Sequence, residues 1–248
     1  MNRTIASLLL ATVIVTPAFG SAATPSAPPV APVSATAPAA ANALEYLNPA
    51  DFEPVRLLPA PAARGSAAEA RELAFVHALI NSASPQRLQQ AKWDADHEDP
   101  AIFNEVIGRD LTKLPHTWAL LTLIQNEASI AAGFSKKYFN RTRPWGADST
   151  IPNCEGPSKK LPLNSYPSGH STLSYSVGYA LAQFMPDKAA AILSKAADYA
   201  ESREYCGQHY ASDTAASQVL GTTAAIRLLN DPRLADQIAA ARAELSSI

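Results

Sequence analysis

The sequence lacks an excess of charge of either sign. Its 248 residues include 20 Lys and Arg against 22 Asp and Glu, which gives a formal net charge of −2 at pH 7. Such a balance provides no long-range attraction to nucleic acid or to an anionic membrane surface. We therefore expect neither as a partner, and any anion site must be built locally from a few converging groups.

Long hydrophobic runs are lacking as well. The mostly apolar stretch at residues 5–15 is shorter than the roughly 20 residues that a transmembrane helix needs. Because it follows Arg3 and precedes small residues, it has the layout of a secretory signal peptide. We predict a signal peptide over residues 1–23, cleaved after Gly20 or Ala23, and a periplasmic or secreted protein. A retained membrane anchor is the alternative.

Large apolar side chains are nearly absent from residues 24–44, which consist mainly of Ala, Pro, Ser, Thr and Val. A segment of this composition cannot bury a core of its own, so we predict a linker. Residues 45–248 remain, and about 200 residues suffice for one sizeable domain.

Cysteine is scarce, with Cys154 and Cys206 as the two examples. In an exported chain a disulfide can form and persist, and we expect these two residues to be joined. Two buried free thiols are the alternative.

Period-two alternation of polar and apolar residues is missing, which argues against half-buried strands. Apolar residues recur at helical spacing instead, and we predict an all-α fold with helices over residues 67–79, 118–134, 173–184, 189–199, 215–229 and 235–245. The proline-rich interval between Arg143 and Pro167 is long for a compact domain, which makes it a candidate functional loop.

Pro167-Ser168-Gly169-His170 closes this interval and opens a predicted helix. Ser168 is a suitable N-cap, and the amides of a first helical turn can bind an anion. Taken alone, these four residues fit an ordinary capped helix with an incidental histidine equally well.

A second pattern runs from Ser202-Arg203 through His209 to Asp213. If Gly207 ends one helix, His209 falls in the first turn of the next, and Asp213 lies on the same face. A carboxylate so placed can hold one imidazole nitrogen and leave the other free for nucleophilic attack. Taken alone, the pair is more typical of a surface contact.

A third pattern, Lys136 followed by Arg143-Pro144, lies at the end of the long apolar helix. Arginine offers phosphate a planar fork of donors, and lysine offers a compact charge. Basic residues at a helix end usually face water, and we interpret the neighbours Lys137 and Arg141 in this way.

Together the three patterns resemble the three-part motif of the type 2 phosphatidic acid phosphatase superfamily, which implies the all-α fold shared with vanadium haloperoxidases. Within it the chain resembles the bacterial class A nonspecific acid phosphatases, also through Leu57-Leu58-Pro59-Ala60-Pro61 and Cys206-Gly207. Trp145 and Tyr210 stand where Phe and Trp are frequent in the family, which leaves substrate preference open.

The resemblance implies a role for each motif residue. His209 would attack phosphorus, Asp213 would orient it, and His170 would protonate the leaving group and later activate water. The phosphate would be held by Lys136, Arg143, Ser168, Gly169 and Arg203. Cationic side chains and helix N-termini can stabilise the transferred phosphoryl group without a metal, so we expect no metal and no cofactor.

The expected substrates are small-molecule phosphate monoesters over a broad range, with phosphotransfer as a further activity, and we expect a homo-oligomer. A vanadium-dependent haloperoxidase and a non-enzymatic phosphate-binding protein are the alternatives.

The acidic run Trp93–Asp99 lacks the glycine of a calcium loop and is interpreted as a solvated loop. We interpret His77 and His116 as structural or surface residues.

Overall fold

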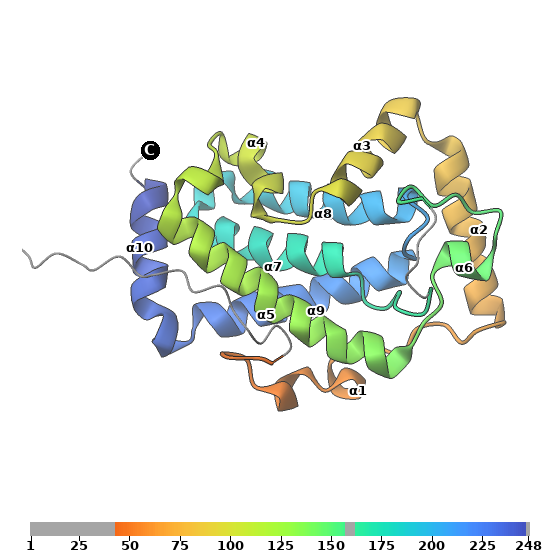
Figure 1. The fold of residues 1–248 in the computed structure, drawn as a ribbon, viewed down its shortest axis with the longest axis horizontal. Helices are drawn as coiled ribbons and strands as arrows, with labels where there is room; N and C mark the ends of the chain where they lie inside the picture. The colour runs from red at the N-terminus through yellow and green to blue at the C-terminus, as the bar shows by residue number, and fades with distance from the viewer. Residues whose placement is uncertain (1–42, 157–161, 247–248) are drawn as a thin grey trace, which may run out of the picture. The chain divides into compact units, whose positions relative to one another are not determined.

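The computed structural model describes residues 43–156 and 162–246, which belong to the compact unit Ala40–Ile248. The predicted signal peptide and nearly all of the predicted linker lie outside the described residues. Within these ranges the chain forms helices and no strand, which confirms the predicted all-α single domain (Figure 1).

Among the described residues, seven helices have ten residues or more, and they include all six predicted helices. They are α2 (Ala67–Ser82), α3 (Pro85–Asp96), α5 (Pro115–Phe139), α7 (Gly169–Phe184), α8 (Ala189–Tyr205), α9 (Ala211–Leu229) and α10 (Ala235–Ser246). Helix α3 was not predicted, because its sequence is rich in Gln, Asp and Lys and shows a weak apolar pattern. Three single turns complete the α-helices of the described ranges: α1 (Pro54–Leu57), α4 (Asn104–Ile107) and α6 (Pro144–Ala147).

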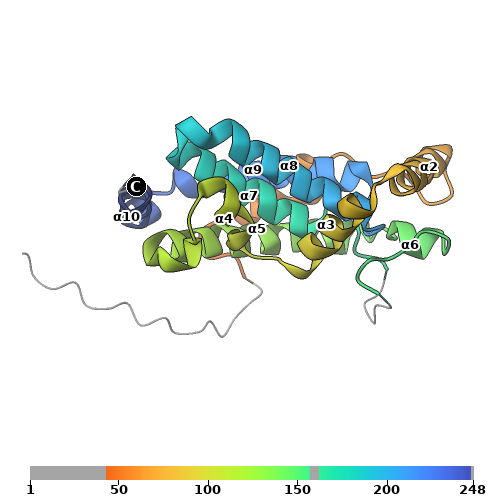
Figure 2. The same cartoon turned by 90° about the horizontal axis from the view of Figure 1, so that it is seen from above.

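Helix α7 lies at the centre of the bundle and packs against α5, α8 and α9 (Figures 1 and 2). Its buried face includes Leu173, Val177 and Leu181. On the facing side of α9, a Cβ atom at Gly221 would lie 2.7 Å from the carbonyl oxygen of Thr172. The absence of a side chain there lets the middle of α9 approach the first part of α7 closely.

One end of the bundle gathers four helix termini. The C-terminal ends of α5 and α8 and the N-terminal ends of α7 and α9 meet there, at the right of Figure 1. A helix N-terminus carries unpaired amides and a partial positive charge. Two such termini together favour an anion at this end of the molecule.

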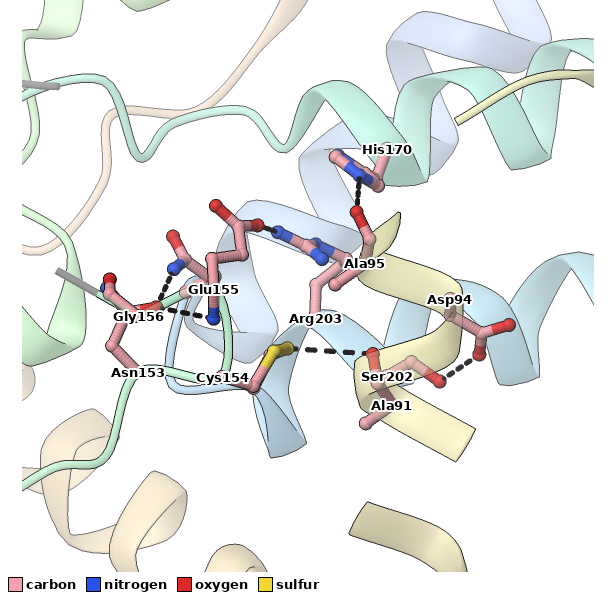
Figure 3. Close-up of a disulfide and its surroundings, with 12 residues drawn as sticks. Ala91, Asp94, Ala95, Asn153, Cys154, Glu155, Gly156, His170, Ser202 and Arg203 are labelled. Carbon is pink, nitrogen blue, oxygen red and sulfur yellow. Dashed lines mark hydrogen bonds and ion pairs between the residues drawn. A yellow bond between two sulfur atoms is a disulfide. The ribbon is translucent and has the colours of Figure 1, made fainter. Parts of the chain in front are cut away.

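The turn between α8 and α9 brings a distant loop to this end. Gly207 has a φ of 65°, in the left-handed region, and a Cβ atom on it would lie 2.1 Å from the carbonyl oxygen of Pro152. Cys154 N donates to Cys206 O at 3.2 Å, and the two cysteines form the predicted disulfide (Figure 3). The disulfide therefore fixes the loop against the end of α8.

Gly207 does follow the end of α8, as predicted, but the predicted placement of His209 is wrong. Helix α9 begins at Ala211, with Tyr210 as the N-cap in an extended conformation, so His209 precedes the helix. The cause is Asp213, whose carboxylate accepts from Tyr210 N at 3.0 Å and fixes the helix start there. In residues 43–156 and 162–246, no helix has the length and apolar character needed to cross a membrane.

Candidate active site

A small pocket at the four helix ends collects most of the predicted site residues. It has a volume of about 180 Å³, and its walls include Lys136, Arg143, Gly169, His170, Arg203 and His209. A larger cavity of about 650 Å³ lies beside α2 and the start of α9, but its lining is mainly Ala, Pro and other apolar groups. The small pocket is therefore the candidate active site, because charge and histidines converge there.

His209 is held by the carboxylate of Asp213. Its Nδ1 lies 3.3 Å from Asp213 Oδ2, and both side chains are buried. Burial lowers the pKa of His209 well below its usual value, and the cations Arg143, Lys136 and Arg203 lower it further. The ring is therefore neutral at physiological pH, with Nδ1 directed at Asp213 and Nε2 as its second nitrogen.

Asp213 is itself fixed by further groups. Its Oδ2 accepts from Ser165 Oγ at 2.6 Å, and its Oδ1 accepts from Arg141 Nη1 at 2.6 Å. Arg141 also pairs with Glu72 of α2 and lies over the ring of Tyr210, 3.8 Å from its centroid. Interpreting Arg141 as a surface residue was wrong, because its side chain is 3% exposed. Asp213 attracts it into the interior as a counter-ion.

Arg203 presents unused donors to the pocket. It is 1% exposed, and its Nη2 pairs with Glu155 of the disulfide loop (Figure 3). Its Nε and Nη1 are buried, and within the described part of the chain they have no hydrogen-bond partner. Because an unpaired buried donor is costly, these two groups are suited to an incoming anion.

Arg143 and Lys136 complete the cationic wall. Arg143 Nε donates to Asn164 Oδ1 at 2.9 Å, and Nη1 donates to Gln208. Lys136 Nζ donates to the carbonyl oxygens of Asn164 and Pro167 at 2.8 and 2.5 Å. Burial, followed by repulsion from neighbouring arginines, lowers the pKa of Lys136 to about 7 and that of Arg143 to about 10. Charge accumulated in this way favours a polyanionic ligand.

The start of α7 contributes the predicted anion turn. Ser168 is the N-cap and its Oγ accepts from Ser171 N at 3.2 Å, which confirms the capping prediction. Gly169 lines the pocket, whereas Ser168 is fully buried and is not part of the lining. Contact between the Ser168 hydroxyl and a phosphate stays a prediction.

His170 lies on the same wall as Gly169. Its Nδ1 is 3.1 Å from Glu98 Oε1, and its Nε2 is 3.2 Å from the carbonyl oxygen of Ala95. Burial lowers the pKa of His170 well below its usual value, and Arg203 lowers it further. The two histidines therefore both favour the neutral form, and a bound anion would favour protonation.

The acidic run at residues 93–99 departs from its predicted role as a solvated loop. Its first four residues belong to α3, and Asp94 is 1% exposed, with Oδ2 accepting from Ser202 Oγ at 2.5 Å. Helix α3 packs on α8, and this contact buries Asp94. Within residues 43–156 and 162–246, no group of three or more His, Cys, Asp or Glu side chains is arranged to hold a metal ion.

The other three histidines of the described part, His77, His97 and His116, do not line the pocket. His77 pairs with Asp148 at 3.0 Å, and His116 is exposed near the C-terminal helix.

Sequence patterns alone missed several residues that shape the site, namely Glu72, Glu98, Arg141, Glu155, Asn164, Ser165 and Gln208. Most lie outside the three motifs and come together only in the folded chain. Gln208 had a signal of its own, since it directly precedes His209.

Comparisons with known proteins identify the family to which this chain belongs. Residues 115–234 match the model of the PAP2 superfamily. A non-specific acid phosphatase of Salmonella typhi is 31% identical over 169 residues, which cover 64% of this chain and 67% of the relative. An acid phosphatase of Zymomonas mobilis is 29% identical over 203 residues, covering 78% and 75%. A non-specific acid phosphatase of Providencia stuartii is 28% identical over 214 residues, covering 83% and 86%.

The matched region, residues 115–234, runs from the start of α5 to just before α10 and therefore contains all three motifs. The three cations of the pocket and the histidine held by a carboxylate lie within it. The chain belongs to the PAP2 superfamily and, within it, groups with the bacterial acid phosphatases.

Proposed function

We propose that this acid phosphatase hydrolyses a broad range of phosphate monoesters through a phosphohistidine on His209, without a metal ion. The observation that carries the proposal is the contact between His209 Nδ1 and Asp213 Oδ2, with His209 in the wall of a pocket that three cations also line. A neutral imidazole held at one nitrogen is a nucleophile at the other.

In the first step, Nε2 of His209 forms a bond to phosphorus while the bond from phosphorus to the ester oxygen breaks. His170 gives a proton to the departing oxygen, which leaves as an alcohol. The nonbridging oxygens are stabilised by Lys136, Arg143 and Arg203, together with the first turn of α7. Binding of the phosphate dianion raises the pKa of His170 and so favours the protonated ring that this step needs.

In the second step, water attacks the phosphohistidine and the bond from nitrogen to phosphorus breaks. His170 takes a proton from the water, and inorganic phosphate leaves. An alcohol in place of water would accept the phosphoryl group, and this is the proposed route of phosphotransfer. Export through a signal peptide and assembly into a homo-oligomer stay predictions.

The metal-free character of the reaction is tested by exhaustive chelation. We expect full activity on an aryl phosphate after chelation, with competitive inhibition by vanadate and by inorganic phosphate. Loss of activity in chelator, restored by one divalent metal, would contradict the proposal.

Rates on a panel of nucleotides, sugar phosphates and an aryl phosphate test the breadth of the substrate range. Bromide oxidation with added vanadate tests for a haloperoxidase.

A further inference from the structure

Glu98 contacts the proposed general acid in a way that the three motifs do not describe. Its Oε1 lies 3.1 Å from His170 Nδ1, and the carbonyl oxygen of Ala95 lies 3.2 Å from His170 Nε2. An ionised carboxylate and a carbonyl oxygen are both acceptors. The ring can satisfy both contacts only when each nitrogen carries a proton.

The surroundings hold this arrangement in place. Gln125 Nε2 of α5 donates to the backbone oxygen of Glu98 at 2.9 Å, and Tyr199 OH of α8 donates to the backbone oxygen of His97 at 2.6 Å. The ring of Tyr199 also stacks on His170, with centroids 6.1 Å apart. Two long helices therefore fix the backbone from which the Glu98 side chain extends.

The two nitrogens of His170 face different surroundings. Nε2 meets the backbone of α3, whereas Nδ1 meets Glu98, which lines the pocket beside the cations. The Glu98 side chain is 50% exposed, while that of His170 is 15% exposed. Nδ1 is therefore the ring nitrogen on the pocket side, and the Glu98 carboxylate is its contact there.

The electrostatic need for Glu98 follows from its neighbours. The other titratable groups around His170 are Arg203 and Tyr199 of α8, Arg143 before α6 and His209 before α9. The arginines and His209 oppose a positive charge on the ring. A carboxylate in contact with Nδ1 opposes that effect.

We infer that Glu98 is a positioning residue that holds the His170 ring at Nδ1 and favours its doubly protonated form when phosphate is bound. This inference rests on the proposed function, in which His170 is the general acid. Like Asp213 at His209, Glu98 contacts its histidine ring through Nδ1.

The kinetic test uses Glu98→Gln, with Asp96→Asn as a matched control that removes one exposed carboxylate two residues away. General acid catalysis contributes about 100-fold or more, and an alkyl alcohol needs it most. We expect Glu98→Gln to lower kcat for an alkyl phosphate by at least about tenfold, and to change kcat for a nitrophenyl phosphate by less than about threefold. The control should behave as wild type. Equal losses on both substrates would contradict the inference.

A readout independent of turnover is the titration of the histidine ring protons by NMR, in enzyme saturated with inorganic phosphate. We expect the pKa of His170 to fall by about one pH unit or more in Glu98→Gln, while that of His77 is unchanged. An unchanged pKa of His170 would overturn the inference. A lowered pKa in an enzyme that forms no phosphohistidine would support the pairing and contradict the proposed nucleophile instead.

Discussion

Arg141 Nη1 donates to Asp213 Oδ1 at 2.6 Å, while Asp213 Oδ2 faces Nδ1 of His209. The two oxygens of one buried carboxylate are thus divided between a structural cation and the proposed nucleophile. Glu72 pairs with Arg141 from α2 and extends the network to a helix that contributes no motif residue. The orientation of His209 therefore depends on a network that reaches a residue far outside the motifs, Glu72.

Removing the Arg141 side chain leaves Asp213 and Glu72 without their shared cation. Breaking a buried ion pair by deleting one partner costs about 3–5 kcal/mol, and we expect Arg141→Ala to lower the free energy of unfolding by a similar amount. It should also lower kcat, because Asp213 is free to turn away from His209. Urea unfolding and aryl phosphate kinetics measure both effects. Lys137→Ala, at an exposed position close in sequence, should change neither, and wild-type stability of Arg141→Ala would contradict the account.

Sequence periodicity was sufficient to predict the helical fold because the apolar faces of α5, α7 and α9 repeat strongly. It could not predict α3, whose face toward α8 includes a buried Asp94 in place of a large apolar group. Motif spacing located both histidines and three cations. It could not reveal Glu98 or Arg141, because their partners His170 and Asp213 lie about 72 positions away in each case.

From the lowered pKa of Lys136 we predict the pH above which activity falls. Its pKa is lowered to about 7, so the ammonium is charged below that pH and becomes neutral as pH rises through it. Since a neutral amine binds phosphate weakly, kcat/KM should fall above about pH 7. Lys136→Arg should move this limb to higher pH, because arginine stays charged.

The matched control for this prediction is Lys137→Arg, on the exposed side of the same turn. Its pH profile should coincide with that of wild type. If the alkaline limb lies at the same pH in wild type and in Lys136→Arg, another group sets it.

We expect the disulfide to contribute a measurable share of the free energy of unfolding. Cys154 and Cys206 are separated by 52 positions, and crosslinks of this kind typically contribute about 2–4 kcal/mol. The double variant Cys154→Ser with Cys206→Ser should lose that amount in urea unfolding. The unfolded, unreduced mature protein should show no free thiol, and titration of two thiols would contradict the bond.

Because Glu204 is buried, we expect the protein to lose stability as the solution becomes neutral. Burial raises its pKa from 4.5 to about 7, and its Oε1 accepts from Thr214 Oγ1 at 2.7 Å. Below about pH 4.5 the Glu204 carboxyl is protonated in both the folded and the unfolded protein. Between the two pKa values the unfolded chain loses its proton first, so stability falls as pH rises through about 7, by an amount on the order of 3 kcal/mol.

Glu204→Gln should remove this component, so its stability should exceed that of wild type by an increasing margin between pH 4.5 and pH 8. The comparison is made by urea unfolding at several pH values. Glu201→Gln, at an exposed position of the same helix, should follow wild type closely. If the free energy of unfolding varies with pH in the same way in wild type and in Glu204→Gln, Glu204 is ionised in the folded protein and its burial costs no stability.

The unequal roles of the two histidines are the central claim, and trapping the phosphoenzyme tests it most directly. His170→Ala removes the proton donor and the base, but a nitrophenyl leaving group hardly needs the donor. We expect a burst of nitrophenol, slow release of phosphate and acid-labile phosphate on His209 in His170→Ala, with none in His209→Ala. Phosphate trapped on His170 in His209→Ala would reverse the assignment, and the absence of phosphohistidine in every variant would favour direct attack by water.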